Sequence, residues 1–324
     1  MAGAAIDYAL EGHIADWARG TIRVSASASA DGFGSVALSE TVMFKDSPLF
    51  WGLPFAGGSI LENILGSCLN LVLASDGTGM TGVVDDLHLS TVPVLGRKYV
   101  NVDLSNKEGI ERAKELGLGT SGMADVDISP LLHEASDALF SHMNQGRLFI
   151  MVRHPVEREF ARLKHMKEYD QDLFVKNSDR GMSYADFAQS DYVADNWMTR
   201  TLVRKGVDEQ LTARDMHTAK EILRRKALVG LYTDIMGASR HYARYFGWDN
   251  AMQGGKLSEG TLSCFESAIL EGMKNYNVAG DDTQEGSHLL EGSNAWSTIM
   301  EKNKFDFELY VYSQQLYKFQ IALS

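Results

Sequence analysis

The sequence has few cysteines, a deficit of positive charge and no long apolar run. Its two cysteines, Cys68 and Cys264, are too few for a disulfide framework and are not spaced as metal ligands. They could pair with each other, or remain buried and reduced. Because 31 lysines and arginines are outnumbered by 43 aspartates and glutamates, the net charge is −12, which argues against a protein that binds nucleic acid by neutralising phosphates. If this protein binds an anion, its cations must be concentrated locally.

No apolar segment reaches the length of a membrane span. The first residues lack a basic segment followed by an apolar one, so they do not resemble a secretory signal. We expect a chain that is soluble as written, or one anchored through a segment upstream of it. With 324 residues, 44% of them hydrophobic, the chain is long enough for one extended α/β domain. Residues 1–46 are interpreted as an N-terminal appendage, and residues 47–324 as the folded domain.

Short apolar runs alternate with amphipathic segments along the chain. Strands are predicted at 49–53, 97–103, 124–129, 147–153 and 227–231. Helices are predicted at 60–72, 107–116, 131–142, 156–168, 183–189, 195–203, 212–226, 234–246, 262–273, 295–302 and 307–319. This alternation predicts an α/β fold with a central, mainly parallel sheet flanked by helices, and a helical C-terminal half.

The segment 47–73 is the first that indicates a ligand. A buried strand is predicted at 49–53, a tight turn at Gly57 and Gly58, and a helix from Ile60 onward. A strand, a glycine turn and a helix in this order direct backbone N–H groups and the positive end of the helix toward an anion. Adjacent glycines permit both the backbone angles of such a turn and the close approach of a phosphate. A strand–helix turn without any ligand has the same pattern, so the loop alone does not assign a function.

The segment around Arg153 is the second segment that indicates a ligand. Arg153 ends a predicted strand just before a helix, which is where α/β sheets bind ligands, and its planar guanidinium suits a phosphate. Six basic and two acidic residues give the segment 147–167 a charge of +4. We expect Arg158, Arg162 and Lys164 to form the solvated face of the helix. The position of Arg153 is instead fixed by the end of the strand.

These segments resemble the nucleotide-binding motifs of sulfotransferases that use 3′-phosphoadenosine 5′-phosphosulfate (PAPS). Residues 54–60, PFAGGSI, are similar to the family's 5′-phosphosulfate loop, roughly P-K-x-G-G-T-T, with Phe55 at the lysine position and Ile60 at the last threonine. Residues 153–158, RHPVER, are similar to the 3′-phosphate motif R-D/H-P-V-E-R-x-x-S, whose serine position is Ala161.

Other segments extend the resemblance over residues 48–319. Residues 195–200 are similar to the family's N-x-x-T-R helix, 228–231 with 245–248 to its V-G-L…F-G-W segment, and 303–315 to its closing N-x-x-D-x-x-L-Y-x-Y helix. Residues 99–103 and 291–296 resemble algal and diatom-like members in particular. Together these segments resemble the carbohydrate-directed branch of the sulfotransferase family.

The resemblance implies a P-loop sulfotransferase-like fold that transfers a sulfuryl group from PAPS to a hydroxyl of a carbohydrate, without a metal. The segment made of Phe55, Ala56, Gly57, Gly58, Ser59 and Ile60 would then surround the 5′-phosphosulfate. Arg153 would bind the 3′-phosphate, with Ala161 beside it. Arg97, Lys98 or Arg200 could supply the charge of the missing lysine. Enzymes of this branch work in the Golgi lumen behind an N-terminal anchor, so the resemblance also implies a secretory location.

Catalysis further requires a general base for the acceptor hydroxyl. His133, which follows the predicted strand 124–129, is the predicted base, with Asp127 and Glu62 as alternatives. Since loss of one electrostatic donor costs roughly 100- to 1,000-fold in rate, Phe55 at the lysine position favours a second hypothesis, a sulfotransferase-fold protein that binds or scaffolds without turnover. A P-loop kinase or nucleotidase would need G-x-x-x-x-G-K-[ST] and an acidic magnesium ligand, which this loop does not provide.

Overall fold

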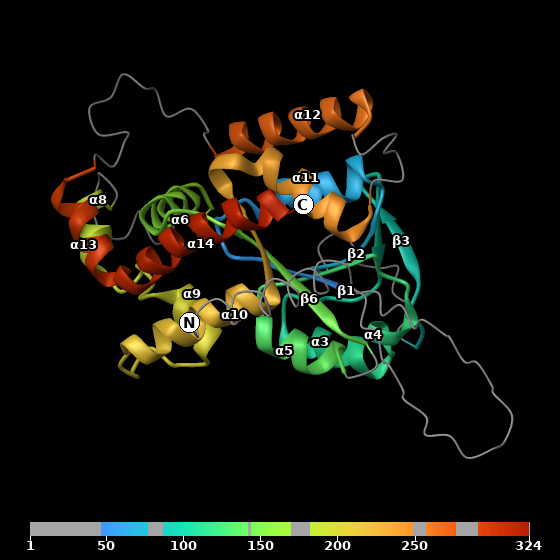
Figure 1. The fold of residues 1–324 in the computed structure, drawn as a ribbon, viewed down its shortest axis with the longest axis horizontal. Coiled ribbons are helices and arrows are strands. Elements are labelled where there is room, and N and C mark those ends of the chain that lie inside the picture. Colours follow the sequence, from blue (N-terminus) through green and yellow to red (C-terminus); the bar gives the residue numbers. More distant parts are fainter. Residues whose placement is uncertain are drawn as a thin grey trace, which may run out of the picture.

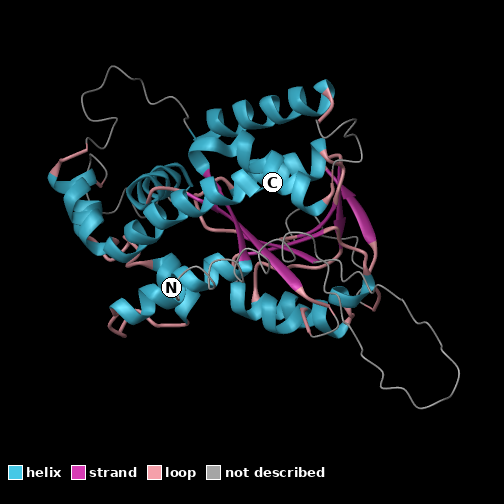
Figure 2. Cartoon of the chain, viewed as in Figure 1, coloured by secondary structure: helices cyan, strands magenta, loops and turns pink. Residues whose placement is uncertain are grey.

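A computed structural model describes residues 47–76, 87–141, 144–169, 182–248, 257–276 and 291–323. The predicted N-terminal appendage, residues 1–46, lies outside the described residues. Seven strands form one sheet in the order β3-β4-β2-β5-β1-β6-β7, with helices on both faces (Figures 1 and 2). All neighbouring strands are parallel except β3 and β4. The prediction of an α/β fold with a mainly parallel sheet is therefore confirmed.

The elements follow the alternation expected from the sequence. The strands are β1 (Ser47–Trp51), β2 (Val72–Ala74), β3 (Thr91–Val94), β4 (Arg97–Val100), β5 (Val126–Ser129), β6 (Gly146–Val152) and β7 (Ala227–Leu231). The first helices are α2 (Gly58–Asn63), the π-helix η1 (Ile64–Cys68), α3 (Lys107–Glu115), α4 (Leu118–Ser121), α5 (Leu132–Leu139) and α6 (Pro155–Tyr169). The C-terminal half contributes α8 (Tyr184–Gln189), α9 (Trp197–Val203), α10 (Ala213–Lys226), the 3₁₀ turn η2 (Tyr232–Asp234), α11 (Ile235–Phe246), α12 (Glu259–Tyr276), α13 (Asn294–Lys302) and α14 (Lys304–Leu323). Figure 1 shows α11 and α12 on one face of the sheet and α3, α4 and α5 on the other.

Helix starts agree with their local sequence signals. Ser183 caps α8 by accepting a hydrogen bond from the backbone N–H of Asp186. Thr212 and Asp215 form a capping box at α10. These boundaries are encoded within a few residues of chain, which is why the sequence predicts them.

The helix predicted over 60–72 is wrong at its C-terminal end. The helix ends at Cys68, Asn70 adopts φ 53°, and the chain enters β2, which pairs with β4 and β5. A short apolar run has no period that separates a strand from a helix, so sheet pairing decides the conformation of residues 72–74. The strand β3 has no predicted counterpart because it contains Pro93. The proline is tolerated because β3 lies at the edge of the sheet.

Side chains of β1 and β6 form the centre of the core on both faces of the sheet. On one face, Phe149 contacts the rings of Phe50 and Tyr242 with centroids 5.1 and 5.0 Å apart. On the other, Trp51 stacks on Trp197 of α9 at 5.7 Å and donates its indole N–H to the carbonyl oxygen of Pro130. Because consecutive residues of β1 are fixed on opposite faces, the loop that follows β1 is held firmly in place.

The two cysteines form a disulfide between η1 and α12, with Cα atoms 5.6 Å apart. The alternative of two buried reduced thiols is therefore wrong for this structure. The bond attaches α12 directly to the helical segment that follows the glycine turn.

Candidate functional site

The glycine turn connects β1 to α2 at the carboxyl edge of the sheet. Gly57 has φ 93°, a conformation that side chains with a Cβ rarely adopt, and a Cβ built there would lie 2.9 Å from the ring of Tyr232. A Cβ at Gly58 would make only ordinary contact with Phe50, at 3.5 Å. The turn therefore requires glycine at position 57 but not at position 58.

Arg153 lies beside this turn, immediately after β6. Its Nη1 donates a hydrogen bond to the carbonyl oxygen of Phe55 at 3.2 Å, and its guanidinium lies 4.1 Å above the ring of Tyr232. Its Nε is buried without a hydrogen-bond partner among the described residues, at 3.6 Å from an oxygen of Glu157. Since β1 and β6 are parallel neighbours, their carboxyl ends bring the two predicted anion-binding segments together.

The residues that depart from the PAPS motifs have structural roles in packing. Ile60 exposes 1% of its surface and packs against α12 at Gly272, where any Cβ would collide with its side chain. Ala161 is buried on α6. The Phe55 ring lies edge-on to the ring of His165, also on α6, with centroids 5.4 Å apart. Ser59, by contrast, is exposed in the first turn of α2.

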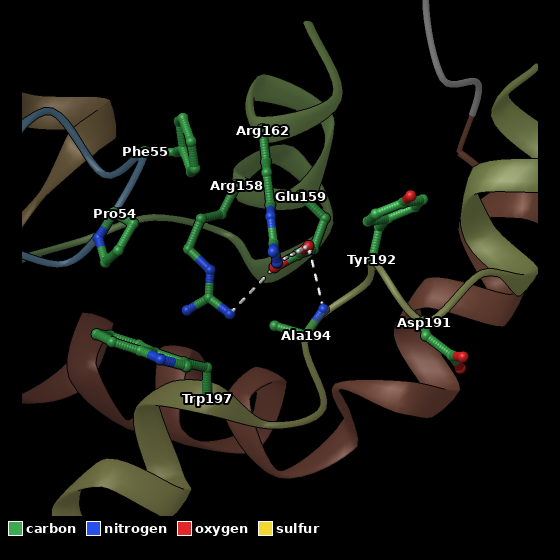
Figure 3. A pocket seen from close by; sticks show the side chains of 9 residues that line it. All are labelled: Pro54, Phe55, Arg158, Glu159, Arg162, Asp191, Tyr192, Ala194 and Trp197. Carbon is green, nitrogen blue, oxygen red and sulfur yellow. Dashed lines mark hydrogen bonds and ion pairs between the residues drawn. The ribbon is translucent and has the colours of Figure 1, made fainter. Parts of the chain in front are cut away.

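A pocket with a volume of about 410 Å³ lies next to the turn (Figure 3). Its walls come from the start of the turn, from α6, from the segment between α8 and α9, and from α9 itself. The lining residues are Pro54, Phe55, Arg158, Glu159, Arg162, Asp191, Tyr192, Ala194 and Trp197. Phe55 thus belongs both to the turn and to the pocket wall.

A buried ion-pair cluster lies in this wall. Arg158, whose side chain is 6% exposed, donates to Asp306 at 3.1 Å and lies 3.6 Å from Glu159. Glu159 is 2% exposed, lies 3.5 Å from Arg162 and accepts a hydrogen bond from the backbone N–H of Ala194. Burial raises the pKa of the Glu159 carboxyl, against the opposing charges of the two arginines. The expectation that Arg158 lies on a solvated helix face is wrong, because α14 covers that side of α6.

Asp306 holds the cluster in place. It accepts hydrogen bonds from the backbone N–H groups of Met198 and Thr199 and from the Thr199 hydroxyl, at the start of α9. The side-chain oxygen of Asn196 in turn accepts from the backbone N–H of Asp306. Two of the segments that carry the family resemblance, 195–200 and 303–315, therefore meet here and fix Arg158 and Trp197 beside the pocket.

His133, the predicted base, is not brought to this pocket by the structure. Its Nε2 is paired with the carbonyl oxygen of Thr201, and its Nδ1 accepts from Nε of Arg204. The ring thus ties α5 to the end of α9, and among the described residues it is not part of the pocket lining. The sequence places His133 after a strand end, but the direction of its side chain depends on α9.

The cations proposed to replace the missing lysine lie elsewhere. Arg200 is buried and donates to Asp195 and to the carbonyl oxygens of Gly206 and Glu209. Arg97 and Lys98 lie on β4, which β2 and β5 separate from β1. The cations that share a pocket with Phe55 are Arg158 and Arg162, which sequence reasoning assigned to solvent.

The two alternative bases are buried carboxyls at other positions. Glu62 accepts a hydrogen bond from the hydroxyl of Tyr99 at 3.0 Å, and burial raises its pKa. Asp127 pairs in register with Leu49 of β1, and burial raises its pKa to about 7. Its Oδ1 has no hydrogen-bond partner among the described residues.

Over the part of the chain that is described, no cluster of three histidine, cysteine or acidic side chains has metal-site geometry. No helix in the same part combines the length and apolarity needed to cross a bilayer. No protein-family model matches the sequence, and no curated protein matches it either.

Proposed function

We propose that this protein binds PAPS at the turn between β1 and α2 and transfers its sulfuryl group to a hydroxyl of a carbohydrate. The observation that carries the proposal is the hydrogen bond between Arg153 and the carbonyl of Phe55, which brings both motif segments to one edge of the sheet. A donor with phosphates at its 3′ and 5′ positions needs two anion sites within one nucleotide's reach. Adjacent parallel strands supply that spacing.

Each segment offers suitable groups. The backbone N–H of Ala56 already donates to the carbonyl oxygen of Leu53, so the N–H groups of residues 57–60 and the exposed Ser59 are those that would surround the 5′-phosphosulfate. Arg153 ends its strand at the same edge with a planar guanidinium that suits the 3′-phosphate, and its present contacts are the Phe55 carbonyl through Nη1 and Glu157 at 3.6 Å from Nε. The ring of Tyr232 lies against Gly57 and under the Arg153 guanidinium, and so fixes the orientation of that guanidinium.

Sulfuryl transfer depends on positioning the reactants and on stabilising charge that develops on the leaving phosphate. Phe55 cannot supply that charge, so Arg158 and Arg162 are the cations available within the same pocket. Both are already paired with Glu159, and Arg158 also with Asp306. We therefore expect transfer to be slow relative to a chain that carries lysine in the loop.

That partial neutralisation supports the second candidate function, a donor-binding protein without turnover. The two candidates share the PAPS site and differ only in the transfer step. The disulfide between η1 and α12 adds a point on location, because disulfides are typical of oxidising compartments. It favours the secretory pathway as the place where this protein works.

Calorimetric titration with PAPS and with its product 3′,5′-adenosine bisphosphate tests the donor site. We expect both to bind, and Arg153→Ala to weaken binding roughly 10- to 100-fold through loss of a charged hydrogen-bond donor. Arg147→Ala, at the opposite end of β6, is the matched control and should retain the wild-type affinity. Absence of binding by the wild-type chain would refute the proposal. Transfer of radiolabelled sulfate from PAPS to a polysaccharide then separates the enzyme from the binding protein.

A further inference from the structure

We infer that Glu159 is the general base of this pocket and accepts the proton of the acceptor hydroxyl. This inference rests on the proposed sulfuryl transfer and adds to it a residue that motif comparison does not single out. Glu159 lines the same pocket as Phe55, which is itself part of the turn proposed to hold the donor. A hydroxyl bound in the pocket would therefore have the carboxylate on one wall and the start of the turn, Pro54 and Phe55, on another.

The surroundings of Glu159 suit a base. One of its oxygens is held by the backbone N–H of Ala194, and the carboxylate is 2% exposed, so its direction is fixed and water has little access. The other acidic residue in the lining, Asp191, is exposed. Geometry thus distinguishes Glu159 from Asp191, and the pKa of Glu159, raised by burial, makes it a better proton acceptor than a solvated carboxylate.

Three charged side chains affect the pKa of Glu159: Arg158 and Arg162 on α6 lower it, and Asp306 on α14 raises it. The other titratable residues of the pocket lining are Asp191 and Tyr192, between α8 and α9. Arg158 and Arg162 stabilise the ionised carboxylate before reaction. Once Glu159 takes the proton, its charge disappears and both arginines lose that partner. Their positive charge then stabilises the oxyanions that form in the pocket.

The proposed step is balanced without a further reactant. The acceptor oxygen forms a bond to sulfur, and the bond between sulfur and the bridging phosphate oxygen breaks. That oxygen keeps the electron pair in 3′,5′-adenosine bisphosphate. The acceptor proton moves to Glu159 and is released to solvent when the products leave. The arrangement in Figure 3, with Arg158 and Arg162 both paired to Glu159, thus couples proton acceptance to charge stabilisation.

The test compares wild type with Glu159→Gln, which keeps the size of the side chain and its hydrogen-bond acceptor. Glu168→Gln, at the exposed end of the same helix, is the matched control. PAPS is the donor, and chemically desulfated heparin and chondroitin are the acceptors. We expect Glu159→Gln to lower kcat roughly 100-fold or more, with the affinity for 3′,5′-adenosine bisphosphate close to that of the control. Because the amide no longer neutralises Arg158 and Arg162, the melting temperature should fall as well, so kcat is compared at a temperature where both variants are folded.

Two readouts separate a base from a structural carboxylate. The wild-type kcat should fall on the acid side as Glu159 becomes protonated, and this limb should be missing in Glu159→Gln. Added formate should restore part of the rate of Glu159→Ala. If the wild type transfers sulfate and Glu159→Gln keeps its rate and pH profile, the inference is overturned while the proposed function stands. If the wild type binds PAPS but releases no 3′,5′-adenosine bisphosphate with either acceptor, the inference and the transfer step are both overturned, and the donor-binding protein without turnover remains.

Discussion

Removing the disulfide between Cys68 and Cys264 should destabilise this protein strongly. The bond closes a loop of 196 residues, and it connects the helical segment after the glycine turn to α12. In the chain-entropy description of cross-links, a loop of this length stabilises the folded state by about 5 kcal/mol. For a chain of 324 residues, that free energy corresponds to a decrease in melting temperature of roughly 8 °C.

The assay is thermal unfolding followed by circular dichroism, with and without a reducing agent. Reduction of the wild type should lower the melting temperature, and Cys68→Ala with Cys264→Ala should lower it similarly and remove the effect of the reductant. Because these are the only cysteines in the chain, thiol titration of the unfolded, unreduced protein should find none. Two free thiols per chain, or a melting temperature unchanged by reduction, would refute the disulfide and the covalent attachment of α12 to η1.

Three further predictions concern single residues. Gly57→Ala should lower the free energy of unfolding by about 2 kcal/mol, because position 57 has a positive φ and a Cβ there would clash with the ring of Tyr232. Gly58→Ala should be close to neutral, and equal losses for the two variants in chemical denaturation would contradict the requirement for glycine at position 57 alone. Because burial raises the pKa of Asp127 to about 7, the folded state keeps this carboxyl protonated while the unfolded chain ionises it, so stability should fall as pH rises from about 4 to 7, by on the order of 4 kcal/mol. Asp127→Asn should therefore be more stable than wild type at pH 8 and similar to it at pH 4, and a pH-independent difference would show that the pKa of this carboxyl is the same in the folded and unfolded states. Phe55→Lys should raise the rate of sulfuryl transfer from PAPS roughly 100-fold, and an unchanged rate in an otherwise active protein would move the transfer site away from this turn.

The residues that sequence reasoning placed wrongly have one feature in common. The sequence predicts Arg158 on a charged, solvated helix face, but α14 buries it, and the segment before α9 buries its neighbour Glu159, for which the sequence makes no prediction. His133 follows a strand as expected, yet α9 turns its ring into a packing contact. In each case the partner lies more than 30 residues away along the chain, so local pattern contains no information about it.

The sequence by itself determined the alternation of strands and helices, their caps, the parallel sheet and the strand–turn–helix at Gly57, because periodicity, turn residues and capping groups act over a few residues. Tertiary structure alone decided the pairing of Cys68 with Cys264, the strand conformation of residues 72–74 and the burial of Glu159 between two arginines. Each of these depends on contacts between elements distant in the chain, and the burial that shifts the pKa of a carboxyl exists only after those elements have packed.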